Sequence, residues 1–570
     1  MILIWFSTLL LISVAPATQA ATSVCQNILL YNGDLPLTRN EKILVCGSPK
    51  GPEGWRQVPL PQAEYQLRIL LQQRGYLRPR FEREGETLRV WAGPLQKIGS
   101  LEVLGASGIL EPQQLRQVVG QAMTPEVLDH ASAWASQQLH KQGYACAKVN
   151  VKAQVWDDKL VIEVQLGPRQ RIGKIDFETG GDDRRLIERY QAIRVGDWYD
   201  SRKVELTVNR MLADGLFQNA NFSQNCHGDL VDLILRTSLG PTRLVRFGFG
   251  ASSEEFPFAD LWFKSAKIDR RASSFTATVH ASPRLQNLTV GSQLYWVPGS
   301  NRSFVSPRLR LERQSEIEWE DLHAKVGFDI GRAFDVDNVL VKLRGGPTVN
   351  YLETIRGLGP ERISYLSWEG ALSLTDHDYE LYSRDQAEGW LASLDYRGQR
   401  DRIGSTTTAD RFDLGAKYLW NIRQLSPPLF VLATRIEGVV AIAHDPRNLP
   451  REYRIFYGGD ENLRGWGRKS LDNGGLGFLT SLYLGFELRL IEEMPYRLQP
   501  FLLADWARLG RESLTLDQSL FGSWGAGLRW ASPFGTLRGS AAHGQILNGD
   551  ASTQVYPQEW VYFVSFGQEF

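Results

Sequence analysis

Apolar and polar residues alternate in short segments from Leu244 to the carboxyl terminus, with turn residues between the segments. Ser274 to Ala281 and Ser481 to Leu490 are clear examples. In the last segment one face carries Trp560, Tyr562, Val564, Phe566 and Phe570, and the other carries Ser565, Gly567 and Glu569. A period of two is that of a β-strand, and about 9–11 such residues cross a membrane in a barrel. We count about sixteen segments, which suits a barrel with short turns and some long loops.

The polar faces of these segments carry formal charges, including Glu487, Arg489 and Arg529. A soluble sandwich would also alternate and could expose such a face. A closed array of about sixteen strands instead encloses water and leaves no free sheet edge. We therefore predict a transmembrane antiparallel β-barrel over residues 242–570, with the sandwich as the alternative.

Residues before Leu244 have a different pattern, which repeats. Gly-Pro recurs at positions 93, 167 and 240, at intervals of 74 and 73 residues. A β-rich run precedes each Gly-Pro, and an amphipathic helical pattern ending at a glycine precedes each run: Tyr65 to Gly75, Val127 to Gly143 and Val204 to Gly215. The order is strand, helix, helix, strand, strand. We predict three α+β units, at 21–94, 95–168 and 169–241, of which the first is divergent because Cys25 to Leu60 is proline-rich and shows little helical period.

Composition narrows the functional classes. The 570-residue chain has a formal net charge of +0, which argues against a large basic surface for nucleic acid. Its 17 Trp, 19 Tyr, 25 Phe and 53 Gly suit the aromatic girdles and tight turns of a barrel. Beyond the amino terminus no apolar run is long enough for a membrane-spanning helix.

Residues 1–20 form an apolar run that ends in small residues, and we interpret them as a signal peptide cleaved near Ala20. No Lys or Arg precedes the run, so two alternatives remain: an uncleaved membrane anchor, or a different translation start. Export would expose the cysteines to an oxidising compartment. The sequence alone does not decide whether Cys25 and Cys46 form a disulfide. We do not expect Cys146 to pair with Cys226.

Motifs for enzymatic chemistry are absent from the sequence. There is no Gly-x-Ser-x-Gly, no His-Glu-x-x-His and no phosphate-binding loop, and the eight histidines are scattered. The acidic segment Asp376 to Asp378 is interpreted as a solvated loop. We therefore expect no catalytic residue, no metal and no cofactor, which disfavours an outer-membrane lipase or protease.

Three segments identify the chain by resemblance. Phe456 to Leu471 reads FYGGDENLRGWGRKSL, with Gly458-Gly459-Asp460 before the triplet Arg464-Gly465-Trp466. It resembles the conserved segment of the sixth extracellular loop in the BamA/TamA outer-membrane assembly-factor superfamily. Tyr483 to Arg489 and the segment Gly525 to Gly535, with Gly525, Gly527 and Arg529, resemble two strands of that superfamily. The three amino-terminal units resemble POTRA domains, and this number points to the TamA-like branch.

The resemblance implies a site in the barrel lumen. A glycine-rich loop can fold inward, where Arg464 would lose water and need an acidic partner. In the superfamily the equivalent Arg pairs with an Asp on a neighbouring strand, which corresponds to Asp505. Glu487 is the alternative partner, and a solvated external loop is the alternative placement. Ala507 stands where the superfamily often has Gly.

The resemblance also implies a seam between the first and last strands. Gly248 and Gly250 on one strand and Gly567 on the other lack side chains for cross-strand contacts. Phe566 and the terminal Phe570 belong to the last strand, which resembles the sorting signal of outer-membrane proteins. A weak seam could open to a client strand.

The expected function follows from the resemblance. Periplasmic POTRA domains would receive client outer-membrane or secreted polypeptides, and the barrel would insert or translocate them at the outer membrane. The expected partners are these clients, outer-membrane lipid and a periplasm-spanning protein of the TamB type, but not nucleic acid. The alternatives are a two-partner secretion transporter for one exoprotein and a passive porin.

Overall fold

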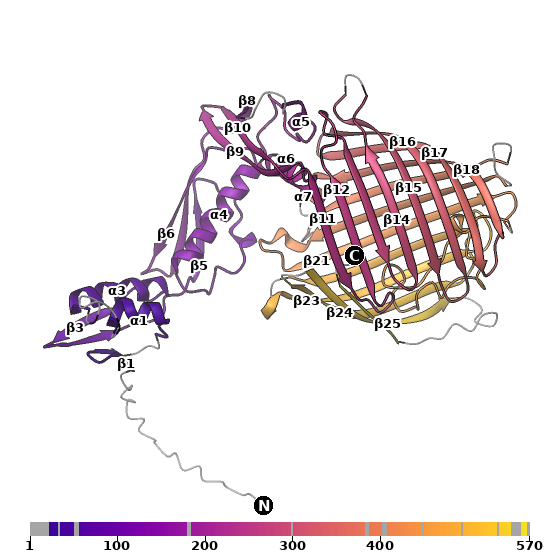
Figure 1. Cartoon of the computed structure of the whole chain (residues 1–570). Helices are drawn as coiled ribbons and strands as arrows, with labels where there is room; N and C mark the ends of the chain where they lie inside the picture. The colour runs from indigo at the N-terminus through magenta and orange to yellow at the C-terminus, as the bar shows by residue number, and fades with distance from the viewer. Residues whose placement is uncertain are drawn as a thin grey trace, which may run out of the picture. The chain divides into compact units, whose positions relative to one another are not determined.

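The computed structural model describes the chain except residues 1–21, 32–34, 49, 51–55, 57, 179–183, 298–299, 382–386, 402–406, 447, 492–493, 533–534, 549–559 and 567–570. The expected signal peptide lies outside the described residues. Contacts divide the chain into two units, Met1–Leu139 with Ala147–Leu166, and His140–Cys146 with Gly167–Phe570. Figure 1 shows small α/β sheets in the first half of the chain and a large sheet in the second half.

The first α/β sheet has the order β1-β2-β4-β3, with β1 (Thr22–Cys25), β2 (Ile28–Tyr31), β3 (Arg80–Glu84) and β4 (Thr87–Trp91). Helices α1 (Arg39–Cys46) and α3 (Leu60–Gln73) contribute Val45, Leu67 and Leu71 to its core. The sequence shows little helical period between Cys25 and Leu60, but α1 forms within this segment. Thr38 and Glu41 form a capping box, which stabilises the amino-terminal end of α1 although prolines surround the helix.

The second sheet has the order β5-β7-β6, with β5 (Ser100–Leu104), β6 (Lys148–Gln154) and β7 (Lys159–Gln165). The helical segments before β6 are η1 (Pro112–Gln114) and α4 (Pro125–Lys141). The sheet buries alternate apolar residues of β7 against α4, which contributes Trp134 and Leu139. Among the described residues β6 pairs only with β7, so this edge of the sheet carries no further strand there.

The third sheet has the order β8-β10-β9, with β8 (Arg171–Phe177), β9 (Phe217–His227) and β10 (Leu230–Leu239). Its helices are α5 (Arg184–Glu188) and α6 (Ser201–Ala213), which Asp200 caps through a hydrogen bond from the Arg202 amide. In the second and third sheets the first strand runs parallel to the last and the two later strands form an antiparallel hairpin. The predicted order of strand, helix, helix, strand, strand is therefore present in both units. The domain boundaries stay a prediction.

A sixteen-stranded antiparallel sheet follows, in which every strand pairs with its neighbour in the chain. Its strands are β11 (Arg243–Gly250), β12 (Phe258–Ser265), β13 (Ser274–Ala281), β14 (Leu285–Gln293), β15 (Ser303–Ser315), β16 (Glu320–Val336), β17 (Val339–Arg356), β18 (Arg362–Asp376), β19 (Gly389–Gln399), β20 (Ala409–Asn421), β21 (Phe430–Ala443), β22 (Thr480–Leu490), β23 (Leu498–Gly510), β24 (Leu520–Ser532), β25 (Gly535–Asn548) and β26 (Trp560–Phe566). The sheet curls into a barrel (Figure 1). The predicted fold class, α+β repeats followed by a barrel of about sixteen strands, is confirmed.

Alternation along the strands separates an apolar exterior from a polar interior. On β16, Val326, Phe328 and Ile330 are 57%, 48% and 61% exposed, whereas Lys325 and Asp329 on the opposite face of the strand are buried. Exposed apolar side chains around the outer surface of the barrel suit a lipid environment, because exposing so much apolar surface to water is unfavourable. No helix in the described part of the chain is long and apolar enough to cross a membrane.

Both pairs of cysteines form disulfides. Cys25 bonds Cys46 within the first α/β unit, with a Cα–Cα distance of 5.7 Å. Cys146, which follows α4, bonds Cys226 on β9, so the expectation that these two stay unpaired is wrong. Their separation of 80 residues hid the pair in the sequence, but the fold brings their Cα atoms to 6.2 Å.

Candidate functional site

The loop between β21 and β22, residues 444–479, folds into the barrel and is called L6 here. Its side chains form part of the buried interior: Tyr453 and Leu463 are 0% exposed, and Arg464 is 1% exposed. The alternative of a solvated external loop is therefore wrong for these residues. A loop of this length can remain inside only if its polar groups find partners there.

Arg464 is surrounded by acceptors from two strands. Its Nε and Nη2 donate to Asp505 Oδ2 and Oδ1 on β23 at 2.9 and 2.8 Å, and Nη1 donates to Glu487 Oε2 on β22 at 2.7 Å. The Arg464 backbone N–H donates to Asp505 Oδ2 as well, at 2.9 Å. Both carboxylates suggested by the sequence thus bind the same guanidinium, and the Ala507 substitution does not prevent it. Such a bidentate pair fixes the orientation of both groups.

Glu487 has two further cationic neighbours. Arg489 Nε and Arg538 Nη2 approach its Oε1 and Oε2 at 2.6 and 2.7 Å. Three cations therefore share the two carboxylates of Asp505 and Glu487. The cluster therefore joins β22, β23 and β25.

Gly465 and Trp466 extend the contact to the next two strands. A Cβ on Gly465 would lie 2.8 Å from Ser523 Cβ and 2.9 Å from Gly544 N, so only glycine fits against β24 and β25 here. Its φ of +114° also favours glycine. Trp466 donates from Nε1 to the Gly522 carbonyl at 3.2 Å and packs edge-on against Phe521.

Gly458, Gly459 and Asp460 lie on the other side of the motif. A Cβ on Gly458 would meet the Gly467 carbonyl at 2.2 Å, so the two arms of the loop are packed together there. The Asp460 N–H donates to Glu254 Oε1 at 3.0 Å. Glu254 belongs to L1, the loop of residues 251–257 that connects β11 with β12.

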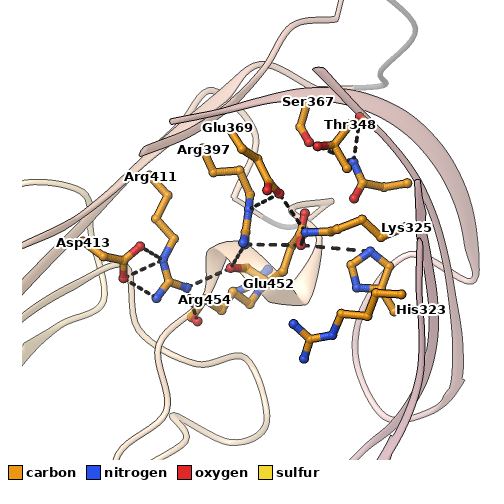
Figure 2. A network of polar contacts seen from close by, with 12 residues as sticks. His323, Lys325, Thr348, Ser367, Glu369, Arg397, Arg411, Asp413, Glu452 and Arg454 are labelled. Carbon is orange, nitrogen blue, oxygen red and sulfur yellow. Dashed lines mark hydrogen bonds and ion pairs between the residues drawn. The ribbon is translucent and has the colours of Figure 1, made fainter. Parts of the chain in front are cut away.

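A second charged cluster holds the beginning of L6. Glu452 lies between Lys325 of β16 and Arg397 of β19, with distances of 3.1 and 3.2 Å to Oε2 (Figure 2). Tyr365 of β18 donates to its Oε1. Glu369, also on β18, binds Lys325 at 2.8 Å and Arg397 at 3.3 Å, which closes the network.

Backbone carbonyls of L6 add to this anchor. Arg411 of β20 binds Asp413 and donates from Nη1 to the carbonyls of Glu452 and Arg454 at 2.8 and 2.9 Å (Figure 2). Arg451 forms an ion pair with Asp321 Oδ2 of β16 at 2.6 Å. L6 is therefore anchored to strands β16, β18, β19 and β20 through residues 451–454, and to β22–β25 through residues 464–466.

The predicted strand motif lies in the wall beside L6. A Cβ on Gly525 would lie 2.2 Å from the Ala541 carbonyl, and one on Gly527 would lie 2.2 Å from the Phe501 ring. Arg529 faces inward and donates to Gln499 Oε1 at 2.6 Å. Because Gly525 and Gly527 have no side chains, β24 can pack closely against Ala541 of β25 and Phe501 of β23.

The two ends of the sheet, β11 and β26, form the predicted seam. No ladder joins the described residues of these strands, in contrast to every other neighbouring pair. Contact is made by Ser253 of L1, whose N–H donates to the Val564 carbonyl at 2.9 Å and whose Oγ accepts from the Val564 N–H at 3.2 Å. Gly248 and Gly250 face inward on β11, and Phe566 ends β26. Gly567 and Phe570 lie outside the described residues.

The segment Asp376 to Asp378 is not a solvated loop, as the sequence suggested. It leads into helix α7 (His377–Leu381), where His377 is buried and binds Asp335 at 3.0 Å. Asp378 binds Arg202 of α6 at 3.1 Å. The segment joins the third α/β sheet to the barrel. No cluster of three ligands that could hold a metal occurs among the described residues.

Comparisons with known proteins agree with this architecture. Residues 373–554, which begin within β18 and include β19 to β25, match the model of the Omp85 superfamily domain. This part of the chain is an Omp85 superfamily domain. The expected superfamily is thereby confirmed, whereas the TamA-like branch stays a prediction.

Several solved structures are similar to this chain at low sequence identity. BamA from Haemophilus ducreyi lacking POTRA domains 1-3 matches with 16% identity and a TM-score of 0.49, over 79% of this chain and 94% of that one. CdiB from Acinetobacter baumannii matches with 14% identity and a TM-score of 0.47, over 83% and 90%. CdiB from Escherichia coli gives 14% and 0.47, over 88% and 95%. No curated protein matches significantly by sequence.

Sequence reasoning missed Glu254, Glu452 and Arg468. Glu452 lies just before the segment Phe456 to Leu471 and Arg468 lies within it, and their charges in a loop predicted to enter the lumen could have indicated them. Their partners could not have been named, since Lys325 lies 127 positions from Glu452 and Glu254 lies 214 from Arg468.

Proposed function

We propose that this Omp85 protein is an outer-membrane assembly or translocation factor without catalytic chemistry. Its α/β units lie in the periplasm and receive client polypeptides, and its barrel inserts or translocates them at the outer membrane. The Arg464 contacts act as a lock that holds L6 inside the barrel and braces the wall from β22 to β25.

The observation that carries this proposal is the unpaired seam. Fifteen neighbouring strand pairs are joined by ladders, whereas β11 and β26 share none among their described residues. A strand edge with free N–H and C=O groups is a template for a further strand. The apolar outer faces of both edges, with Phe247 64% and Tyr562 68% exposed, suit a seam that opens toward lipid.

The α/β units offer free edges of the same kind. In the second sheet β6 pairs only with β7, and in the third sheet β9 pairs only with β10. β6 also borders a cavity of about 550 Å³, whose lining includes Ile69 of α3, Leu128 of α4 and Val151 of β6 itself. An extended client could pair with such an edge through its backbone and place apolar side chains beside it.

Site-specific crosslinking tests the proposal. A photoreactive amino acid replaces Phe566 at the end of β26, and a matched control replaces Phe328, which faces outward on β16 far from the seam in the strand order. We expect many newly exported barrel precursors to be captured at position 566 and few at position 328. Capture of one secreted protein at position 566 would support the alternative, a two-partner secretion transporter. Equal capture at both positions, or none, would contradict the proposed role of the seam.

A further inference from the structure

L6 contacts both sides of the seam. Through Arg464, Gly465 and Trp466 it is fixed to β22–β25, the strands that lead to the last strand. Through Asp460 and Arg468 it is fixed to Glu254 in L1, which directly follows the first strand, β11. The same loop thus holds the chain on both sides of the seam, where no ladder joins the described residues.

We propose that Glu254 is a clasp that fastens the extracellular end of the seam to L6, so that the seam opens after L6 releases L1. This inference deepens the proposed function, on which its biological meaning rests, by naming a control on the seam. The contact lies apart from the Arg464–Asp505 pair.

The clasp uses both oxygens of one carboxylate. Glu254 Oε1 accepts the Asp460 N–H at 3.0 Å, and Oε2 lies 3.3 Å from Arg468 Nη1. The side chain is only 11% exposed. Gly459 leaves the space for it, because a Cβ at that position would lie 2.6 Å from Oε1.

Arg468 is held in place from a second loop. Its Nη2 lies 3.2 Å from Glu316 Oε1, in the segment between β15 and β16, and 3.3 Å from Glu255 Oε1. Lys469 binds Glu316 at 3.1 Å. A cation fixed by several carboxylates is pre-organised, so its contact with Glu254 costs little side-chain entropy.

L1 transmits the position of Glu254 to the seam because it is a tight turn. The Ser252 N–H donates to the Glu255 carbonyl at 2.9 Å, and the Glu255 N–H donates to Ser252 Oγ at 2.9 Å. Ser253, inside this turn and adjacent to Glu254, makes both hydrogen bonds to Val564 of β26. Movement of Glu254 away from L6 therefore also moves the residue that bridges the strands.

The electrostatics favour a contact that can be released. Burial raises the pKa of the Glu254 carboxyl, and Arg468 lowers it less than burial raises it. The ionised side chain therefore loses part of its hydration without full compensation. A client strand that pairs with β11 or β26 has to displace this incompletely compensated contact and the two hydrogen bonds between Ser253 and Val564.

Hydrogen exchange of the full chain in phospholipid vesicles tests the clasp. Glu254→Ala removes both contacts, and Glu254→Gln keeps an acceptor for Asp460 but removes the charge opposite Arg468. The matched control, Glu318→Gln, removes an exposed carboxylate from the loop after β15. We expect exchange in peptides covering 243–250 and 560–566 to rise roughly tenfold to a hundredfold in Glu254→Ala, as for loss of a charge-assisted hydrogen bond, and less in Glu254→Gln.

Exchange in residues 498–510 of β23 should stay unchanged in all variants, which separates seam opening from unfolding of the barrel. Unchanged exchange at the seam in both folded Glu254 variants would overturn the clasp. If Glu254→Ala does not assemble, Glu254→Gln and Arg468→Gln decide by the same readout. Crosslinking at position 566 is a separate readout. Client capture together with unchanged hydrogen exchange rejects only the clasp. Altered hydrogen exchange without client capture rejects only the proposed function.

Discussion

The guanidinium of Arg464 and the carboxylate of Asp505 face each other through two parallel hydrogen bonds of 2.9 and 2.8 Å, with both side chains at most 1% exposed. Removing one partner of such a pair leaves a buried charge, which costs about 3–5 kcal/mol. We therefore expect Asp505→Asn and Arg464→Gln each to lower the unfolding temperature of the barrel strongly, as judged by the loss of fast migration in unboiled electrophoresis samples.

The double variant decides whether the two residues act together. Its loss of stability should be much smaller than the sum of the single losses, because each single variant already breaks the shared contact. Asp517→Asn is the control, since Asp517 forms a 3.6 Å pair with Arg511 at an exposed site and should change stability by less than about 1 kcal/mol. Additive single effects would show that the pairing does not stabilise the barrel.

Gly465 is expected to be intolerant of any side chain. Its φ of +114° disfavours other residues, and a Cβ would meet Ser523 and Gly544 within 3 Å. Gly465→Ala should cost about 3 kcal/mol or more, from backbone strain and overpacking together. Gly474→Ala, in the same loop at φ +68° with nothing within 4 Å of the new Cβ, should cost about 1 kcal/mol. The same electrophoretic assay compares them, and equal losses would mean that contact with the wall is unimportant.

The sequence predicted the strands better than the contacts that join distant parts of the chain. Alternation predicted Ser274 to Ala281, and β13 has the same bounds, because one face meets lipid and the other water throughout. The Arg464 motif led to Asp505 and Glu487 only through the resemblance to a superfamily. Periodicity alone cannot say which lumen carboxylate a loop cation will meet.

Other features had weak or misleading signals. Prolines around α1 obscured a helix whose start is nonetheless marked by Thr38 and Glu41. Asp376 to Asp378 read as a polar loop, since nothing local shows that α6 will supply a cation for it. Glu452 acquires its partners from three different strands, and each of those pairings depends on the register of the closed sheet.

The Cys146–Cys226 disulfide should stabilise the third α/β sheet. It closes a separation of 80 residues, and removal of a native disulfide typically costs about 2–5 kcal/mol. In the full chain, Cys146→Ser with Cys226→Ser should speed proteolytic cleavage near β9 and leave the barrel resistant. Cys25→Ser with Cys46→Ser is the matched control and should expose the first sheet instead. Unchanged cleavage near β9 would show that packing alone holds this region.

The contact between α6 and the barrel gives the last prediction. Arg210 Nη2 lies 2.8 Å from both Asp335 Oδ1, at the end of β16, and Glu380 Oε2, in α7. Arg210 and Asp335 are 10% and 8% exposed, so Arg210→Gln removes a buried cation shared by two carboxylates and should weaken docking by about 1.5–3 kcal/mol.

Arg202→Gln removes a neighbouring cation from the same helix but breaks a pair that is 32% and 26% exposed, which should cost less than about 1 kcal/mol. Hydrogen exchange in residues 201–213 and 377–381 of the full chain measures both variants. Because Arg302 and His377 still bind Asp335, we expect faster exchange in α6 and α7 of Arg210→Gln without unfolding of β16. Similar exchange in the two variants would show that the buried pair does not hold the third sheet to the barrel, and that apolar contacts such as Leu206 with Leu381 do so instead.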